Sequence, residues 1–323
     1  MEPFKLLRPS DNHSAIQISG RFIAGGTNLL DLMKLNIETP KQVIDINRLP
    51  FNKIEETKTG GVLIGALVKN SDLAYHPIIK SKYTVLAEAL LSGASPQLRN
   101  MASVGGNIMQ RTRCPYFYST DFACNKRQPG LGCSAINGFN RNNAVLGTSD
   151  KCIATHPSDM CVAMAALSAT IHVQGPNGVR IIPFVDFHLL PGQTPYIEHN
   201  LKKGELITHV EIPPLSATTK SHYLKVRDRA SYEFALTSAA VVLDIQNGRI
   251  KNAAVAFGGV GTKPWRSTLA EKVLIGAQAN EQTYRTAAEA ALSQAKGYKD
   301  NIFKIELAKR TLVRALKTVE GLS

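Results

Sequence analysis

The sequence predicts an α+β protein made of two domains. Through the first 215 residues, short strand-like runs alternate with helical runs, and several connections contain glycine pairs. One segment, residues 109–155, has little periodicity and separates two patterned parts. Beyond residue 215 the pattern begins again with strands and finishes in a helical stretch. We therefore expect domains at 1–215 and 216–323, with 109–155 as an insertion in the first.

The first hundred residues predict strands, one tight glycine turn and helices. The run GRFIAGGTNLLDLMK reads as a strand over 21–24, a glycine turn and a helix opened by Thr27 or Asn28. Polar–apolar alternation on both sides of Gly60-Gly61 predicts a β-hairpin. Residues 71–93 carry apolar side chains at helical spacing, and Gly93 is placed to end that helix.

The later elements follow the same reasoning. ATIHVQGPNGVRIIPFVDF predicts a hairpin that turns at 176–178, and ELITHVEIPPL predicts a closing strand. In the second domain HYLKVRDR predicts a strand, and residues 233–242 predict a helix. Two strands should then flank Asn247-Gly248, before a helical C-terminus.

Charge and hydropathy exclude some classes of function. The chain has 38 Lys and Arg against 25 Asp and Glu, a net charge of +13. These basic residues are dispersed and match no helix-turn-helix or RNP-type signature, so we do not expect nucleic-acid binding. The charge suits an anionic cofactor or an acidic partner surface. No stretch is apolar enough to predict a membrane span, and MEPFKLLRPSDN lacks the pattern of a signal peptide.

All five cysteines lie between residues 114 and 161. A disulfide framework is unusual in a chain long enough to bury a large core. Zinc sites usually show close C-x2-4-C pairs, which do not occur here. Widely spaced thiolates on loops suit an iron–sulfur cluster at least as well. Spacing alone therefore leaves iron–sulfur, zinc and free or bridged thiols open, and Cys161, in the apolar run DMCVAMAAL, reads as a buried structural thiol.

Two diglycine turns are candidates for binding a phosphate. AGGTN (24–28) and ASVGGN (102–107) each combine two glycines with a hydroxyl and an asparagine. Glycines allow the backbone to approach a phosphate, and free amides at a helix start stabilise its charge. Either turn alone could be an ordinary loop. Together they favour a dinucleotide whose pyrophosphate is held from two sides.

Other chemistry-bearing residues are few. Asp159, in THPSDM, is placed at a helix start and could be simple capping material. Lys225 and Arg227 lie on a strand-like segment where a cation could face a ring, a phosphate or solvent. No H-E-x-x-H or G-x-S-x-G motif occurs, so hydrolytic chemistry is not indicated.

Several motifs in order resemble one family. FIAGGTNLLDLMK, IGALV, ASVGGNI, PSDM and LKVRDRASYEFALTSAAVVL are similar to the FAD-binding subunits of molybdenum hydroxylases, which include xanthine and carbon monoxide dehydrogenases. The resemblance implies a two-subdomain FAD-binding domain of the vanillyl-alcohol-oxidase (PCMH) type. It also implies a small α/β C-terminal domain of the CO-dehydrogenase flavoprotein type.

The resemblance also suggests roles for individual residues. The cysteine-bearing insertion is similar to the subgroup whose flavin subunit carries a 4Fe-4S cluster, with the bacterial periplasmic-type aldehyde oxidoreductase nearest. It implies four cluster ligands: Cys114, Cys124, Cys133 and Cys152. The implied FAD contacts are Ala24, Gly25, Gly26, Thr27, Asn28, Leu29, Ser103, Gly105, Gly106 and Asn107, with Asp159 at the ribityl or ribose hydroxyls and Lys225 near the flavin ring.

The function implied is electron transfer within an enzyme complex. A molybdopterin-binding large subunit would oxidise an aldehyde, a 2Fe-2S small subunit would relay electrons, and this chain would pass them through FAD to an acceptor. We expect a heterotrimer in the periplasm, exported with a signal-bearing partner; the alternative is the cytoplasm. A 4-hydroxybenzoyl-CoA-reductase-like or other molybdenum hydroxylase subunit, a stand-alone flavoprotein oxidase and a zinc-stabilised interaction subunit are the alternative functions.

Overall fold

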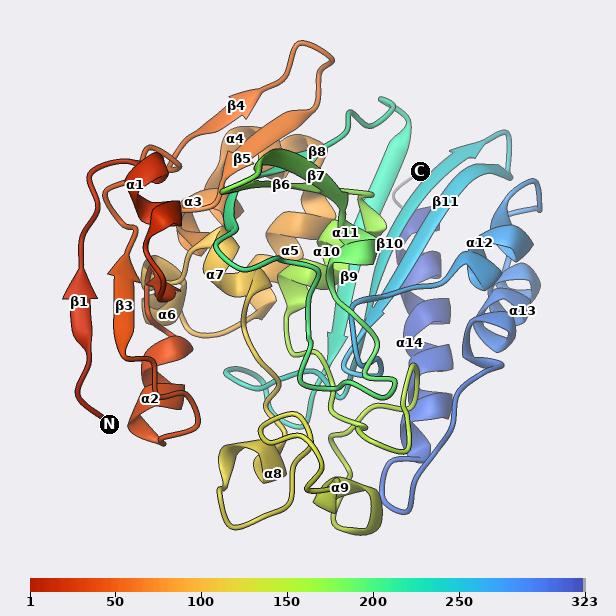
Figure 1. Cartoon of the computed structure of the whole chain (residues 1–323). Helices are drawn as coiled ribbons and strands as arrows, with labels where there is room; N and C mark the ends of the chain where they lie inside the picture. Colours follow the sequence, from red (N-terminus) through yellow and green to blue (C-terminus); the bar gives the residue numbers. More distant parts are fainter. Residues whose placement is uncertain (322–323) are drawn as a thin grey trace.

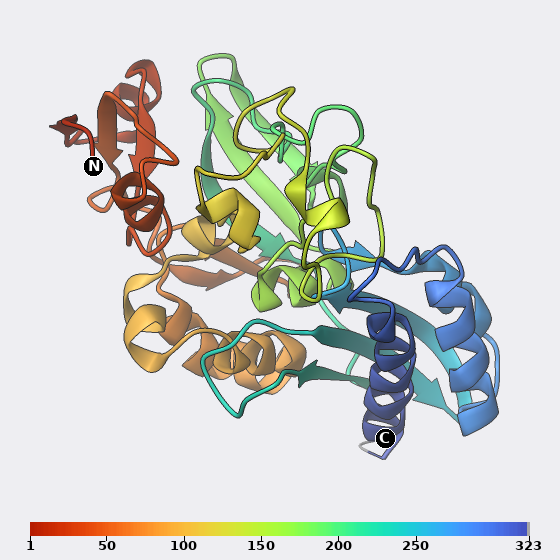
Figure 2. The same cartoon turned by 90° about the horizontal axis from the view of Figure 1, so that it is seen from below.

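The protein, described here by a computed structural model over residues 1–321, contains three sheets in a row (Figures 1 and 2). The final two residues of the expected second domain, 322–323, lie outside this range. A small N-terminal subdomain stands at one end, a helix-rich middle subdomain follows, and the C-terminal sheet and its helices form the other end (Figure 2). The α+β class with two subdomains and a smaller C-terminal domain is confirmed.

The N-terminal subdomain is a three-stranded parallel sheet in the order β1-β3-β2. Its strands need crossover connections because parallel neighbours cannot be joined by a tight turn. Two short helices provide these connections, and Asp11 caps the first by accepting from the Ser14 N–H. The elements are β1 (Lys5–Leu7), α1 (Asn12–Gln17), β2 (Arg21–Ile23), α2 (Leu29–Lys34) and β3 (Gln42–Asp45).

The middle subdomain is a five-stranded antiparallel sheet covered by helices. The hairpins predicted at Gly60-Gly61 and at 176–178 are confirmed as β4–β5 and β6–β7. The helical run 71–93 is broken into three, since Pro77 lacks an N–H and opens a new helix. The strands are β4 (Ile54–Glu56), β5 (Val62–Gly65), β6 (Thr170–Gly175), β7 (Gly178–Pro183) and β8 (Leu206–Ile212). The helices are α3 (Asn70–Tyr75), α4 (Pro77–Lys82), α5 (Thr84–Ser92), α6 (Pro96–Met101), α7 (Val104–Ile108), α10 (Asp159–Ala166) and α11 (Phe184–Phe187).

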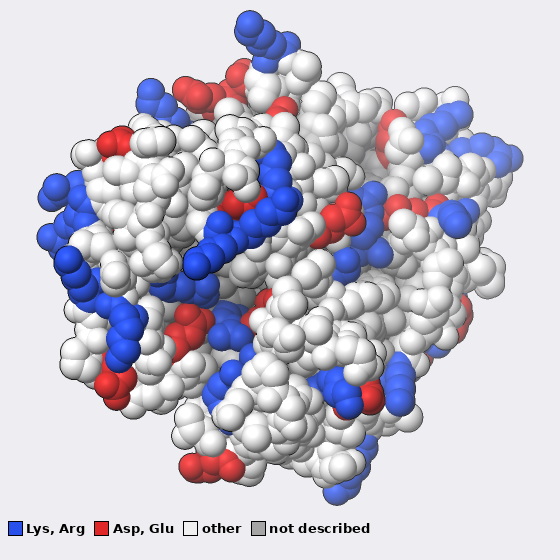
Figure 3. Space-filling model, in the orientation of Figure 1, with Lys and Arg blue, Asp and Glu red and all other residues white. Residues whose placement is uncertain are grey.

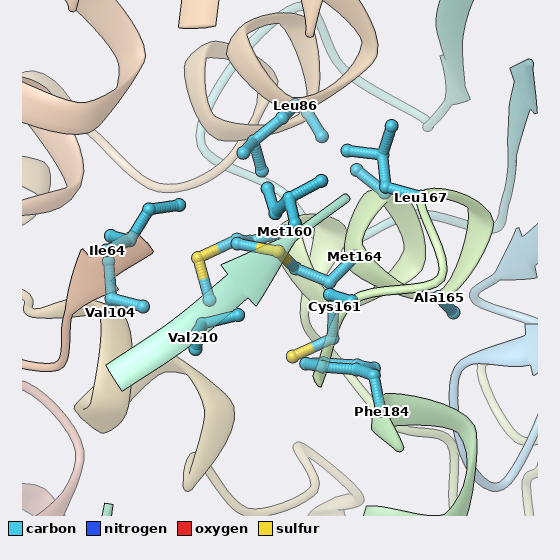
Figure 4. Close-up of a cluster of buried hydrophobic side chains, with 14 of the residues drawn as sticks. Ile64, Leu86, Val104, Met160, Cys161, Met164, Ala165, Leu167, Phe184 and Val210 are labelled. Atoms are coloured by element: carbon cyan, nitrogen blue, oxygen red, sulfur yellow. The ribbon is translucent and has the colours of Figure 1, made fainter. Parts of the chain in front are cut away.

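Helix α10 lies at the centre of this subdomain and is buried along its whole length. Its apolar side chains meet those of α5, β5, β8 and α11 in one core (Figure 4). The Cys161 sulfur lies beside Phe184 in this core (Figure 4). The other four cysteines belong to a separate cluster. The prediction that Cys161 is a buried structural thiol agrees with this position.

The C-terminal domain is a four-stranded antiparallel sheet in the order β12-β11-β10-β9, with three helices packed on it. Its longest helix, α14, contacts β9 and β10. The elements are β9 (Thr219–Val226), β10 (Thr237–Gln246), β11 (Arg249–Gly258), β12 (Trp265–Arg266), α12 (Thr268–Leu274), α13 (Glu281–Leu292) and α14 (Phe303–Glu320).

The helix predicted over 233–242 is wrong, because residues 237–246 form the strand β10. Its alanines favour a helix locally. However, β10 is a central strand whose two faces both meet apolar cores. Its sequence therefore lacks the polar–apolar alternation by which a half-buried strand is recognised. Ala240 and Val242 join the core of the middle subdomain, whereas Val241 and Leu243 join the core of the C-terminal domain. Burial on both faces outweighs the helical preference of the segment.

The insertion is largely irregular and lies below the sheets in Figure 1, between α2 and the lower end of α14. It contains two short helices, α8 (Pro115–Tyr118) and α9 (Ser134–Asn137). Among residues 1–321, no helix combines the length and the low charge that crossing a bilayer requires.

Candidate cofactor sites

The first diglycine turn opens onto a groove of about 370 Å³. The turn connects β2 to α2 and requires glycine at both positions. A Cβ on Gly25 would lie 1.9 Å from the Met101 carbonyl oxygen, and Gly26 has a φ of +72°. Nine of the predicted FAD contacts line this groove: Ala24, Gly25, Gly26, Thr27, Asn28, Leu29, Ser103, Gly105 and Gly106. The segment 199–207, which leads into β8, supplies much of the rest of its lining.

The backbone amides of this turn are available to a ligand. In the part of the chain that the structure describes, no hydrogen bond is donated by the N–H groups of residues 26–29. They belong to the start of α2, where a helix leaves its first N–H groups without partners inside the helix. Unpartnered N–H groups and a positive helix end favour an anion. The geometry is therefore that of a phosphate cradle.

The second diglycine turn uses most of its amides within the protein. The N–H groups of Val104, Gly105, Gly106 and Asn107 all donate within the protein, to Val68, Ala66 and Ser103. A Cβ on Gly105 would lie 3.1 Å from Ala66, so this glycine allows α7 to pack closely against the β5 side. These four amides are therefore engaged within the protein. In the described part of the chain the Ser103 N–H donates no hydrogen bond, and Ser103 lines the groove, so a grip from two sides stays a prediction.

Asp159 and Lys225 form one buried ion pair. Lys225 Nζ donates to Asp159 Oδ2 at 2.8 Å, and the two side chains are 4% and 8% exposed respectively. Lys225 also donates to the Ser92 carbonyl at 3.1 Å, and the Tyr223 hydroxyl donates to Asp159 Oδ1 at 2.6 Å. Burial, followed by the Asp159 charge, holds the pKa of Tyr223 well above its ordinary value. The pair thus ties the end of α5, the start of α10 and β9 together.

This ion pair is linked to the second turn but does not line the groove. Ser158 caps α10 by accepting from the Cys161 N–H, and it donates to Asn107 Oδ1 at 2.6 Å. Asn107, Asp159 and Lys225 are not among the residues that line the groove, and Ser158 connects Asn107 to the start of α10, where Asp159 lies. The structure brings nine predicted FAD contacts to one cavity and these three to an adjoining polar cluster. The roles of all twelve stay predictions.

The four cysteines of the insertion lie in one apolar cluster. The sulfurs of Cys114, Cys124, Cys133 and Cys152 are surrounded by side chains that include Phe117 and Ile153. Leu32 belongs to this cluster and also lines the groove. Asn28 adds a second link, since its side chain donates to the Tyr118 hydroxyl and accepts from the Arg111 N–H. The thiol cluster and the groove therefore share a wall.

Backbone N–H groups point at these sulfurs. The amides of Tyr116 and Phe117 face Cys114, and those of Ala135, Ile136 and Ile153 face Cys133. The Ala154 N–H donates to Cys152 Sγ at 3.5 Å. Burial raises the pKa of Cys152 to about 12, and the neighbouring Cys133 and Cys114 charges act in the same direction, although Lys126 opposes them. Burial likewise raises the pKa of Cys114 and Cys133, which favours their protonated form, and bound iron or zinc would replace such protons.

A second group of possible ligands was not foreseen from the sequence. Among residues 1–321, the one group of three His, Cys, Asp or Glu side chains whose ligand atoms lie within 4.8 Å of one another is His156, Cys161 and His188. Burial lowers the pKa of both histidines, that of His188 to about 4. The Ser158 N–H donates to His156 Nδ1, so this nitrogen is the acceptor of the neutral ring. We assign no metal to this group.

Two of the basic residues near the cysteines, Arg111 and Lys126, are paired with carboxylates. Glu198, which is partly buried, meets Arg111 at 2.5 Å and Lys126 at 3.2 Å, and Glu38 adds a contact to Arg111 at 3.2 Å. These attractions hold the pKa of Glu198 below its ordinary value, although burial opposes them. No sequence signal joins these residues, because Glu198 is far from Arg111 in the chain. On the face shown in Figure 3, Lys and Arg form several separate groups with Asp and Glu among them.

Two family models match the chain. Residues 2–215 match the FAD binding domain in molybdopterin dehydrogenase, and residues 222–319 match the CO dehydrogenase flavoprotein C-terminal domain. The aldehyde oxidoreductase FAD-binding subunit PaoB of Escherichia coli (strain K12) is 52% identical over 305 residues, which are 94% of this chain and 92% of that protein. The glyceraldehyde dehydrogenase medium chain of Sulfolobus acidocaldarius is 29% identical over 98% of this chain and 94% of its own length.

Solved structures of the same fold include a carbon monoxide dehydrogenase from Hydrogenophaga pseudoflava that lacks the Mo-pyranopterin moiety of its molybdenum cofactor. One of its chains superposes with a TM-score of 0.78 at 25% identity, over 99% of this chain and 98% of that chain. A chain of a Cu,Mo-CO dehydrogenase in its cyanide-inactivated form gives a TM-score of 0.79 at 24% identity, with both chains fully covered. The predicted family and fold class are confirmed.

Proposed function

Because this chain belongs to the family of FAD-binding subunits of molybdenum hydroxylases, we propose that it is the FAD- and 4Fe-4S-containing electron-transfer subunit of a heterotrimeric aldehyde oxidoreductase. Family membership establishes the oxidoreductase class and the FAD-binding role. The proposal adds the aldehyde substrate of the complex, the cluster, the partners and the compartment. The similarity to the E. coli aldehyde oxidoreductase subunit supports an aldehyde as the substrate of the complex.

The group of four thiols, three of them buried and Cys133 partly buried, carries the proposal of a cluster. Cys114, Cys124, Cys133 and Cys152 come from separate loops of the insertion into one apolar cluster. Amide N–H groups directed at the sulfurs are the contacts that stabilise thiolates and tune the potential of iron–sulfur clusters. A largely buried group of four thiols with amides directed at its sulfurs fits this cofactor.

The separation of these thiols also supports iron–sulfur over a single zinc ion. Zinc with Zn–S bonds of about 2.3 Å would hold its sulfurs roughly 3.8 Å apart in a tetrahedron. Within the described residues, no three of the four insertion thiols are grouped within 4.8 Å. A cubane cluster is larger, because its cysteines bind different iron atoms.

FAD would occupy the groove with its pyrophosphate at the free amides of residues 26–29. When bound, FAD can exchange electrons singly with iron–sulfur centres and in pairs with an acceptor. The residues that line the groove would hold and orient the cofactor. Asp159 compensates the charge of Lys225, so this pair orders the surrounding backbone and does not present a bare cation to the ring.

The partners would be a molybdopterin-binding large subunit and a 2Fe-2S small subunit. A net charge of +13 suits docking against acidic partner surfaces. The groups of Lys and Arg seen in Figure 3 are distributed, as expected for contact with more than one partner. We propose that the assembled complex is periplasmic and is exported with a signal-bearing partner.

Analysis of the purified chain tests the proposal. We expect bound FAD together with about four irons and four sulfides per chain, and an EPR signal at low temperature after dithionite reduction. Zinc in place of iron would rule out the iron–sulfur cluster. A colourless preparation would rule out bound flavin. Aldehyde turnover by the isolated chain would point instead to a stand-alone oxidase. Co-purification with tagged partner subunits and fractionation of the periplasm test the assembly and the compartment.

A further inference from the structure

One side-chain amide reaches the thiol cluster. Asn143 is buried, and its Nδ2 donates to Cys114 Sγ at 3.6 Å. The other contacts described above for Cys114, Cys133 and Cys152 come from the backbone. Asn143 therefore provides a hydrogen bond that a single substitution can remove.

The C-terminal domain fixes the position of Asn143. The Asn143 carbonyl accepts from Lys304 Nζ at 3.0 Å and from Asn301 Nδ2 at 3.3 Å. Lys304 also donates to the Gly259 carbonyl at the end of β11. Lys304 and Asn301 are fully buried, so the start of α14 holds this part of the insertion in a dry environment.

A second contact holds the same segment. The Asn140 N–H donates to Asp300 Oδ2 at 3.2 Å, and the Asp300 N–H donates to Asn140 Oδ1 at 3.0 Å. The Ala144 N–H then donates to the Ile153 carbonyl at 2.8 Å, next to Cys152. Residues 140–144 are thus clamped between the C-terminal domain and the cysteines.

We propose that Asn143 is a positioning residue that raises the reduction potential of the cluster, and that the start of α14 holds it in place. The inference rests on the proposed 4Fe-4S cluster. Reduction adds one electron to the cluster and changes no bond or proton, so its negative charge increases. A donor to a ligand sulfur stabilises the more negative state, and low dielectric strengthens this effect. Removing the donor should therefore make reduction harder.

Redox titration of the purified chain, followed by EPR, tests this role. Asn143→Leu removes the donor with little change in volume, and Asn143→Asp replaces it with a carboxylate of the same shape. We expect both variants to keep wild-type iron and sulfide content and to shift the midpoint potential to more negative values. The shift should be larger for Asn143→Asp because of its charge.

Asn125→Leu is the matched control. Asn125 is also a buried amide of the insertion, but its side chain bonds the Lys151 carbonyl and the Gly132 N–H. It should leave the potential unchanged. Unchanged potentials in both Asn143 variants, or loss of iron from both, would overturn the tuning role. If wild-type protein contains no iron–sulfur cluster, the proposed function itself fails, which is a separate result.

Discussion

Lys304 gives a quantitative prediction about stability. Its ammonium group is fully buried and bonds two carbonyl oxygens, with no carboxylate partner among its hydrogen bonds and ion pairs in residues 1–321. Burial, helped by the Arg141 charge, lowers the pKa of Lys304 from 10.5 to about 7. The folded protein therefore releases this proton more easily than the unfolded chain does. Replacing Lys304 with Met removes the group while keeping a long, flexible side chain.

The sign and size of the effect follow from linkage. Between pH 7 and 10.5 the unfolded chain binds more protons at this site, so the free energy of unfolding rises with pH in this window. A pKa difference of about 3.5 corresponds to roughly 5 kcal/mol over the full window. Between pH 7 and pH 9 alone, Lys304 should contribute a rise of about 2 kcal/mol. Lys304→Met should lack this rise.

Urea unfolding at several pH values measures the difference. The single tryptophan, Trp265, lies in β12, so its fluorescence reports on the domain that holds Lys304. Titration of other groups is common to both proteins and cancels when wild type and Lys304→Met are compared. Equal pH slopes for the two proteins would refute the argument, because they would mean that Lys304 keeps an ordinary pKa when folded.

Two further predictions concern the cofactor sites. Asp159→Ala leaves Lys225 buried without its carboxylate, so we expect a loss of stability of about 3–5 kcal/mol and weaker FAD retention on gel filtration. Asp159→Asn can still accept from Tyr223, so its stability and FAD retention should lie between those of wild type and Asp159→Ala. Wild-type FAD occupancy in both variants would contradict a role of Asp159 in FAD retention. Cys161→Ser should keep wild-type iron content, because Cys161 lies in the α10 core, whereas Cys133→Ser should lose iron. Iron loss from the Cys161 variant would mean that the four ligands are wrongly chosen.

Local sequence patterns were sufficient to predict the elements that depend on neighbouring residues. The two hairpins and the tight turn at Gly25-Gly26 depend on glycine conformation and on alternation within a few residues, and the structure has them where the sequence predicted them. The grouping of the cysteines was also visible, since they fall within one segment of the chain. For the same reason, nine predicted FAD contacts could be placed together, because they come from two continuous motifs.

Contacts between distant segments determined the features that the local sequence could not predict. Strand β10 was predicted as a helix because its alanines favour one locally, and burial between two cores overrides that preference. In the second diglycine turn, the Val104 and Gly105 amides donate to the carbonyls of Val68 and Ala66, which follow β5, so they are not free for a phosphate. Whether a backbone N–H is free depends on whether a carbonyl from a distant segment accepts its hydrogen bond, and this cannot be predicted from the local sequence.

The sequence by itself therefore determined the family, the fold class and the residues that could bind cofactors. The tertiary structure decided which of them meet. Asp159 and Lys225 were separate candidates, and the packing of α10 against β9 joined them into one ion pair. Asn143 and Lys304 had no signal at all, because their contacts link segments far apart in the chain. Burial strengthens such contacts by removing water, so the residues that tune a site can be found only after the chain has folded.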